Sequence, residues 1–202
     1  MNFLAHQYLS GENESLRFGN FIADFVKGKK YLNYEKDIQL GILYHREIDW
    51  FTDNHSITRE STSLLRNDFG KYAGVALDVY FDHFLSKNWS EYSKIPLNEY
   101  TRSTYEIVGA NKEKCPARAL HMLRYMKRDD WLFNYQYPEA VGRSLKGISS
   151  RTNFDSGLEK GKEVLLREYE YLKSAFEIFI ADIISNKSSI LLNANSKYEE
   201  NL

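Results

Sequence analysis

Two carboxylates and an imidazole stand inside an apolar run between residues 77 and 89, LDVYFDHFLSKNW. Asp78 and Asp82 are four residues apart, so both point to one side of a helix, and His83 lies about 100° further round. Burying a carboxylate without a partner is very costly. A divalent cation is one such partner, and it would also relieve the repulsion between the two aspartates.

The same combination of residue types recurs in three other stretches. GILYHREIDWFTDNH carries His45 and Asp49 four residues apart, on one helix face, with Arg46 beside them. GNFIADFVKG carries Asp24, and NFLAHQYL carries His6, each among apolar residues. If these faces meet, their oxygen and nitrogen ligands suit Mn²⁺, Mg²⁺, Fe²⁺ or Zn²⁺. The single cysteine of the chain excludes a thiolate site.

Each candidate also has an ordinary structural explanation. His6 taken alone is more typical of a core histidine bonded to a backbone carbonyl than of a metal ligand. Asp49 can pair with Arg46 or Arg59, and Asp78 with a lysine or arginine from elsewhere in the fold. The combination therefore predicts a metal centre more strongly than any one spacing does.

Composition predicts a cytoplasmic, soluble protein of one domain. The chain has 202 residues, 27 basic and 28 acidic, and a formal net charge of -1. This balance gives no reason to expect a nucleic acid or a membrane as partner. Cys115 has no second cysteine to pair with, which fits a reducing compartment. No apolar run is long enough to span a bilayer, and the N-terminus does not resemble a signal peptide.

Apolar residues recur mostly at helical spacing, so we expect an all-α, single-domain helical bundle. The expected helices cover residues 2–10, 15–27, 35–51, 56–67, 71–88, 97–110, 116–128, 138–146 and 158–185. The last of these reads as one long amphipathic helix. The domain is expected to span 1–186, and the polar segment 187–202 is expected to be a frayed tail.

Five stretches together resemble the acyl carrier protein phosphodiesterase family. They are MNFLAHQYLS, GNFIADFVKG, GILYHREIDWFTDNH, LDVYFDHFLSKNW and ISSRTNF, and the similarity runs to about residue 180. The resemblance implies hydrolysis of the phosphodiester that joins 4'-phosphopantetheine to a serine of acyl carrier protein. It also implies a helical fold similar to the HD phosphohydrolases and a divalent metal, with manganese preferred over Mg²⁺ or Fe²⁺.

Carried over residue by residue, the resemblance implies a set of metal ligands and a second set around it. The implied ligands are Asp24, His45, Asp82 and His83, with His6, Asp49 and Asp78 as second choices. The order Asp82-His83 reverses the His-Asp order that names the wider superfamily. The ligand scheme of that superfamily therefore does not transfer helix by helix.

The remaining polar residues of these stretches are expected to act on the substrate. Asp49 or Asp78 would orient a water molecule or take its proton, and His6 or His45 would protonate the leaving serine oxygen. Arg46 and Arg151 are expected to bind the oxygens of the phosphodiester through their planar guanidinium groups.

A basic region is expected to receive the acidic carrier protein. Residues 115–151 carry seven basic side chains against three acidic ones. Two other functions remain open: an HD-like phosphohydrolase acting on a nucleotide or other small phosphoester, and a non-catalytic helical binding protein. No glycine-rich phosphate loop supports the nucleotide alternative.

Overall fold

The computed structural model describes residues 2–200, and that range folds into helices joined by turns and short loops, with no strand. Its α-helices are α1 (Phe3–Ser10), α2 (Glu14–Ile22), α3 (Lys36–Asn54), α4 (Ser56–Phe69), α5 (Ala73–Lys87), α6 (Trp89–Tyr92), α7 (Leu97–Ala110), α8 (Ala117–Arg128), α9 (Trp131–Asn134), α10 (Pro138–Ser149), α11 (Gly161–Arg167) and α12 (Tyr169–Glu199). Short 3₁₀ turns are η1 (Ala23–Phe25), η2 (Gly28–Asn33), η3 (Gly70–Tyr72) and η4 (Leu158–Lys160). The expected all-α class is confirmed. Among the described helices, none combines the length and the apolar character needed to cross a membrane.

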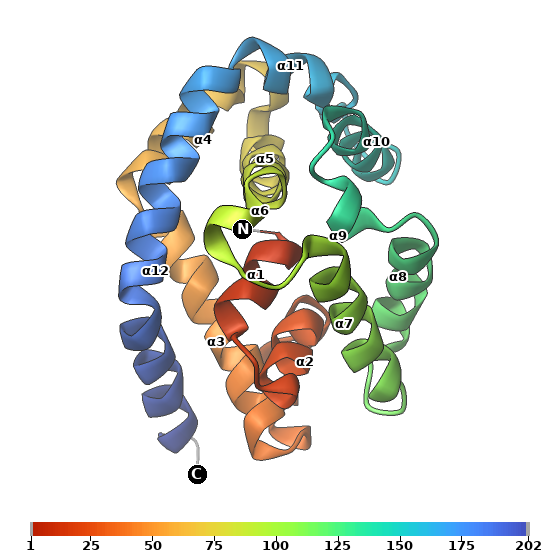
Figure 1. Cartoon of the computed structure of the whole chain (residues 1–202), viewed down its shortest axis with the longest axis vertical. Helices are drawn as coiled ribbons and strands as arrows, with labels where there is room; N and C mark the ends of the chain where they lie inside the picture. The colour runs from red at the N-terminus through yellow and green to blue at the C-terminus, as the bar shows by residue number, and fades with distance from the viewer. Residues whose placement is uncertain (1, 201–202) are drawn as a thin grey trace.

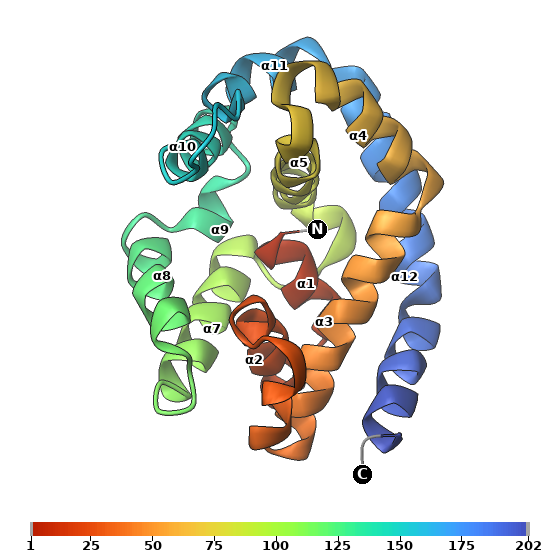
Figure 2. The same cartoon turned by 180° about the vertical axis from the view of Figure 1, so that it is seen from behind.

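The helices pack in the order α12, α3, α2 and α7 across the lower half of the molecule (Figure 1). The view from behind shows the same order, with α2 held between α3 and α7 (Figure 2). The short helix α1 contacts α2, α3 and α5, and its side chains Leu4, Ala5 and Leu9 are fully or almost fully buried. The polar side chains of α1 are therefore held in the interior by three neighbouring helices.

Two glycines let the backbones of α2 and α3 touch. A Cβ atom on Gly41 would lie 2.3 Å from the carbonyl oxygen of Leu16, and one on Gly19 would lie 2.2 Å from that of Ile38. Non-bonded atoms do not approach each other this closely, so any side chain at these positions must push the two helices apart. His45 follows Gly41 by one helical turn, and the close crossing therefore fixes its position relative to α2.

Replacing Gly41 with alanine should destabilise the fold by about 3 kcal/mol, because the backbone of α2 must move to admit a methyl group. Urea denaturation of the variant measures this loss. Gly74→Ala is the matched control, since Gly74 also lies in a helix but has nothing within 4 Å of its added Cβ. That variant should be as stable as the parent or more so, because alanine has the higher helix propensity. Equal stability of the two variants would contradict the backbone contact.

The C-terminal part differs from its expected structure in two ways. The predicted single helix 158–185 is broken, because Glu168 leaves helical geometry (φ −99°, ψ 18°) between α11 and α12. The predicted frayed tail is wrong, because α12 continues to Glu199. Ile190 and Ala194 are buried there, and Lys197 binds the buried carboxylate of Glu47 on α3. Long-range packing on α3 stabilises this helix, and the polar local sequence gives no sign of that packing.

Candidate metal centre

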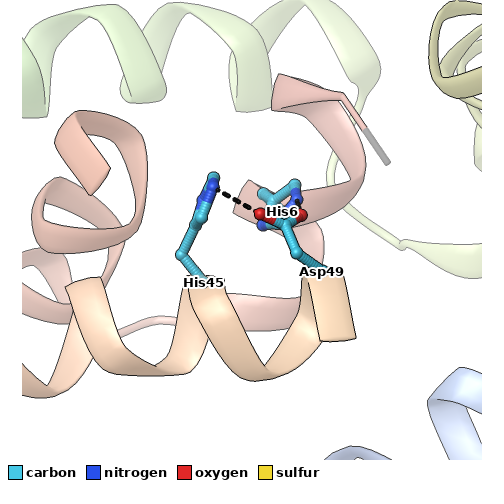
Figure 3. A group of neighbouring side chains, drawn as sticks. All are labelled: His6, His45 and Asp49. Carbon is cyan, nitrogen blue, oxygen red and sulfur yellow. Dashed lines mark ion pairs between the residues drawn. The ribbon is translucent and has the colours of Figure 1, made fainter. Parts of the chain in front are cut away.

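Three side chains from two helices converge in the interior between α1 and α3 (Figure 3). His45 and Asp49 lie one turn apart on α3, and His6 reaches them from α1. Their potential ligand atoms all lie within 4.8 Å of one another. The predicted pairing of His45 with Asp49 on one helix face is therefore present in the fold, and we call this group, with Asp24, the histidine cluster.

The carboxylate of Asp49 bridges the two imidazoles. Its Oδ1 lies 3.1 Å from Nε2 of His6, and its Oδ2 lies 3.1 Å from Nε2 of His45. Asp24 lies on the turn η1, where α2 has ended, and its Oδ1 is 3.6 Å from the same nitrogen of His45. The side chains of Asp49 and Asp24 are 42% and 59% exposed, whereas both histidines are buried. The cluster is thus open to solvent on its carboxylate side.

The histidine cluster leaves hydrogen-bonding capacity unused. The rings of His6 and His45 stack with their centroids 4.1 Å apart. Although Nε2 of His6 is close to Asp49, neither ring nitrogen of this buried residue has a hydrogen-bond partner among the described residues. Leaving such a group unsatisfied costs about 1–3 kcal/mol. Two imidazoles and one carboxylate converge here, with Asp24 3.6 Å from His45, and such nitrogen and oxygen donors are accepted by Mn²⁺, Fe²⁺ or Zn²⁺.

Asn20 on α2 orients His45, and the sequence interpretation missed it. Its Oδ1 lies 2.8 Å from Nδ1 of His45, while its Nδ2 donates to the carbonyl of His6 and to Oγ of Ser10. Because the amide nitrogen is committed to two acceptors, the amide oxygen must accept, and Nδ1 of His45 carries the proton. Nε2 is therefore the nitrogen that faces the two carboxylates, as in ligand histidines held by an outer hydrogen bond. The sequence feature that could have pointed to Asn20 is its position next to Gly19, in an otherwise apolar stretch.

Asn20→Ala should lower the affinity for Mn²⁺ by roughly 10- to 100-fold, which is typical when the outer partner of a ligand histidine is lost. Titration calorimetry with Mn²⁺ measures the affinity directly. Asn13→Ala is the matched control, because Asn13 caps the same helix through Leu16 without touching the cluster. Unchanged Mn²⁺ affinity in Asn20→Ala would show that Asn20 does not position His45.

Ion pairing within the histidine cluster shifts the pKa values of its members so that the charged forms of His45, Asp24 and Asp49 are favoured. Burial lowers the pKa of His45, but the hydrogen bonds and charges of Asp24 and Asp49 outweigh that effect and raise it to about 9. The hydrogen bond to His45 lowers the pKa of Asp24. Burial opposes ionisation of Asp49, yet His45 and His6 lower its pKa overall. Burial and the neighbouring His45 lower the pKa of His6. In neutral solution the carboxylates are therefore ionised and His6 is the neutral imidazole.

Asp82, predicted from the sequence to bind the metal, instead holds the start of α1. Its Oδ2 accepts the backbone N–H of Leu4 at 2.8 Å, and its Oδ1 accepts that of Ala5 at 3.1 Å. These are two of the N–H groups that a helix start leaves without partners. Burial raises the pKa of Asp82 to about 7, although the two N–H donors oppose the shift. The contacts of Asp82 thus give it a structural role. It fixes the backbone of Leu4 and Ala5, directly before His6.

His83, also predicted to bind the metal, lies in another environment. Its Nδ1 lies 2.7 Å from the carbonyl of Tyr135, and its Nε2 lies 3.5 Å from the hydroxyl of Tyr169. Burial lowers its pKa. Its ring nitrogens are not among the ligand atoms that converge at His6, His45 and Asp49. Adjacent residues on a helix point about 100° apart, so His83 and Asp82 face different surroundings.

The predicted substrate-binding arginines are placed differently from one another. Arg46 donates to the carbonyls of Val26 and Gly28 at 3.0 and 2.9 Å, so it fixes the turn that follows Asp24. Arg151 is exposed beyond the end of α10, where its Nε donates to the carbonyl of Gly147. Neither contact brings a guanidinium to the ligand atoms of the histidine cluster.

Two further carboxylates lie near Asp49. Burial and the charge of Asp78 raise the pKa of Asp53, and the charge of Asp49 acts on it in the same direction. Asp53 lies one turn after Asp49 on α3, and Asp78, predicted as a catalytic residue, comes from α5. The carboxylates of Asp53 on α3 and Asp78 on α5 thus repel each other close to Asp49.

Comparisons with known proteins identify the family of the chain. The sequence profile of the family described as "Acyl carrier protein phosphodiesterase" matches residues 1–183. A relative named acyl carrier protein phosphodiesterase from Escherichia coli O45:K1 (strain S88 / ExPEC) is 34% identical over 93% of this chain and 98% of its own length. One of the same name from Enterobacter sp. (strain 638) is 34% identical over 87% of this chain and 92% of its own. No solved structure matches. The chain belongs to the acyl carrier protein phosphodiesterase family.

Proposed function

We propose that this protein is a metal-dependent phosphodiesterase that hydrolyses 4'-phosphopantetheine from holo-acyl carrier protein and leaves the apo carrier. The family and the named relatives support the reaction class and the carrier. The observation that supports the metal dependence is the buried imidazole of His6, which faces His45 and Asp49 and, among the described residues, makes no hydrogen bond beyond its 3.1 Å ion-pair contact to Asp49. Cys115, the one cysteine of the chain, favours the cytoplasm as the location.

The residues that would hold the ion are His6, His45, Asp49 and Asp24. Their mixed nitrogen and oxygen donors accommodate Mn²⁺, which the family resemblance favours, with Mg²⁺ or Fe²⁺ as alternatives. When bound, such an ion supplies Lewis-acid chemistry, since it withdraws charge from phosphate oxygens and acidifies water. Asp82 and His83 are left out of this ligand set because their own contacts engage them elsewhere.

Other residues of the chain position the reacting groups. Asn20 orients the ring of His45 through Nδ1, and Arg46 holds the turn that follows Asp24. Asp78 on α5 is our candidate to orient the attacking water or to take its proton, because its charge reaches Asp53 beside Asp49. The exposed side of Asp49 and Asp24 is where the phosphodiester would approach.

Mass spectrometry of holo-carrier incubated with the protein tests the reaction. In the presence of Mn²⁺ we expect the carrier to lose the mass of 4'-phosphopantetheine, and we expect no loss after chelation of metal. Release of phosphate or base from a nucleotide panel, with holo-carrier left intact, would favour the alternative phosphohydrolase. A purified protein that contains no metal and shows no thermal shift with Mn²⁺ would favour a non-catalytic binding protein.

The carrier should dock on the basic face of α8 and α10. Arg118, Arg124 and Lys127 on α8 and Lys146 on α10 are exposed. Attraction to an acidic partner mainly raises the association rate, and salt screens it. We therefore expect KM for holo-carrier to rise several-fold between low and physiological ionic strength, with kcat unchanged. A KM independent of salt would contradict docking on this face.

A further inference from the structure

A cleft of about 780 Å³ opens between the 3₁₀ turns that follow α2 and the start of α8. Phe25 and Leu32 line one wall, and Cys115 and Pro116 line the other. Pockets that hold small ligands span about 300–1,000 Å³, so the cleft has the size of a binding site. It is separate from the histidine cluster, whose residues do not line it.

The cleft is next to the metal centre along the chain, because the turn η1 carries residues of both. Phe25 and Val26, which line the cleft, directly follow Asp24, whose carboxylate faces His45. Consecutive Cα atoms are about 3.8 Å apart, so the wall of the cleft begins within one or two residue lengths of a candidate ligand. Arg46, next to His45, holds the carbonyl of Val26 at 3.0 Å. One arginine therefore fixes the cleft wall and Asp24 in a single arrangement.

The lining combines apolar, uncharged polar and charged side chains, and the charged ones are Lys30, Glu35 and Lys114. Phe25, Val26 and Leu32 supply apolar surface, while Asn33 and the hydroxyl of Tyr34 supply uncharged hydrogen-bonding groups. Burial raises the pKa of the Cys115 thiol to about 11, so it is neutral at physiological pH. Lys114 is neutralised by Glu35, whose Oε1 lies 2.6 Å from its Nζ. With Glu35 and Lys114 paired to each other, the apolar and uncharged polar groups can contact a neutral chain with amide groups, and Lys30 adds one positive charge to the cleft.

We propose that this cleft binds the pantetheine arm of the substrate while the phosphodiester lies at the histidine cluster. The assignment rests on the proposed function, because it takes the substrate to be holo-carrier. The arm is a neutral chain of amides with a gem-dimethyl group, a hydroxyl and a terminal thiol. Its methyl groups match Phe25, Val26 and Leu32, and its amides match Asn33 and Tyr34. An arm held at η1 would bring its phosphate end toward Asp24.

Titration calorimetry with reduced pantetheine, which lacks the phosphate, tests the cleft without any turnover. The parent should bind pantetheine saturably. Asn33→Trp fills the cleft and Leu32→Glu adds a charge to its apolar wall, so each should weaken binding by about tenfold or more. Asn98→Trp is the matched control, because Asn98 is exposed on α7 and lies outside the cleft. The same two cleft variants should raise KM for holo-carrier and leave hydrolysis of bis(p-nitrophenyl) phosphate, which has no arm, unchanged.

These experiments test the cleft assignment independently of the proposed reaction. No binding of pantetheine by the parent, or equal binding by the parent, Asn33→Trp and Leu32→Glu, would overturn the cleft assignment even if holo-carrier is hydrolysed. Pantetheine binding that is lost in the cleft variants supports the assignment, even in a protein that fails to hydrolyse holo-carrier. Asp49→Asn should bind pantetheine as the parent does while losing hydrolysis, because Asp49 does not line the cleft.

Discussion

His45→Ala is expected to lower the hydrolysis of holo-carrier by roughly 1,000-fold or more, since a lost ligand removes several kcal/mol of charge stabilisation. The imidazole lies 3.1 Å from Asp49 and 3.6 Å from Asp24, so it is the residue that joins the two carboxylates. Without it, the carboxylates face each other across an unfilled space. We therefore expect the variant to lose bound manganese as well as activity. Mass spectrometry of the metal content, after dialysis against Mn²⁺, measures this loss.

The matched control is the same substitution at His83, the buried histidine of the sequence motifs that lies outside the histidine cluster. His83→Ala removes a contact to the carbonyl of Tyr135 and should leave the manganese content of the parent unchanged. It should lose some stability, because the carbonyl loses its partner. If His83→Ala lost its metal while His45→Ala kept it, the histidine cluster would not be the metal centre.

Part of the candidate site follows from local rules that the sequence carries. His45 and Asp49 are four residues apart on a helix whose apolar spacing is clear, so their common face was predictable. The helix starts and ends also agree within a few residues for α1, α3, α5 and α7. Such features depend on helical periodicity alone, and long-range contacts are not needed to find them.

The role of Asp82 depended on contacts that no local pattern encodes. Its apolar setting and its spacing from Asp78 match those of His45 and Asp49, yet its partners are backbone N–H groups of Leu4 and Ala5, far away in the sequence. A buried aspartate that caps a helix and one that binds a metal satisfy the same need for hydrogen-bond donors or positive charge. Only the packing of α1 against α5 separates the two cases.

Asn20 and the helical tail were missed for related reasons. An asparagine in an apolar stretch has no distinctive spacing, and its importance appears only when Gly19 and Gly41 bring α2 against α3. The segment after residue 186 is mostly polar, and its buried face consists of a few apolar side chains, among them Ile190 and Ala194. Both features are set by tertiary contacts with α3.

Asp82→Ala should destabilise the protein by about 3 kcal/mol, because it leaves two buried N–H groups of α1 without an acceptor. Urea denaturation measures the loss. Manganese content distinguishes this role from ligation: the folded variant should still take up Mn²⁺ through the histidine cluster, with lower affinity because α1 carries His6. Full stability combined with complete loss of metal would instead restore Asp82 to the ligand set. Asp82→Asn should cost less, since its amide oxygen still accepts one N–H bond.

The pH dependence of this loss identifies its cause. Burial raises the pKa of Asp82 from 3.8 to about 7 in the folded protein. Since the folded value lies above the unfolded one, the contribution of this carboxyl to stability is complete below pH 3.8 and is lost as the pH rises through 7. Asp82→Asn cannot ionise, so its cost relative to the parent should be larger at pH 5 than at pH 8. A cost that grew with pH would mean that the N–H donors outweigh burial, and that α1 is held by an ionised carboxylate throughout.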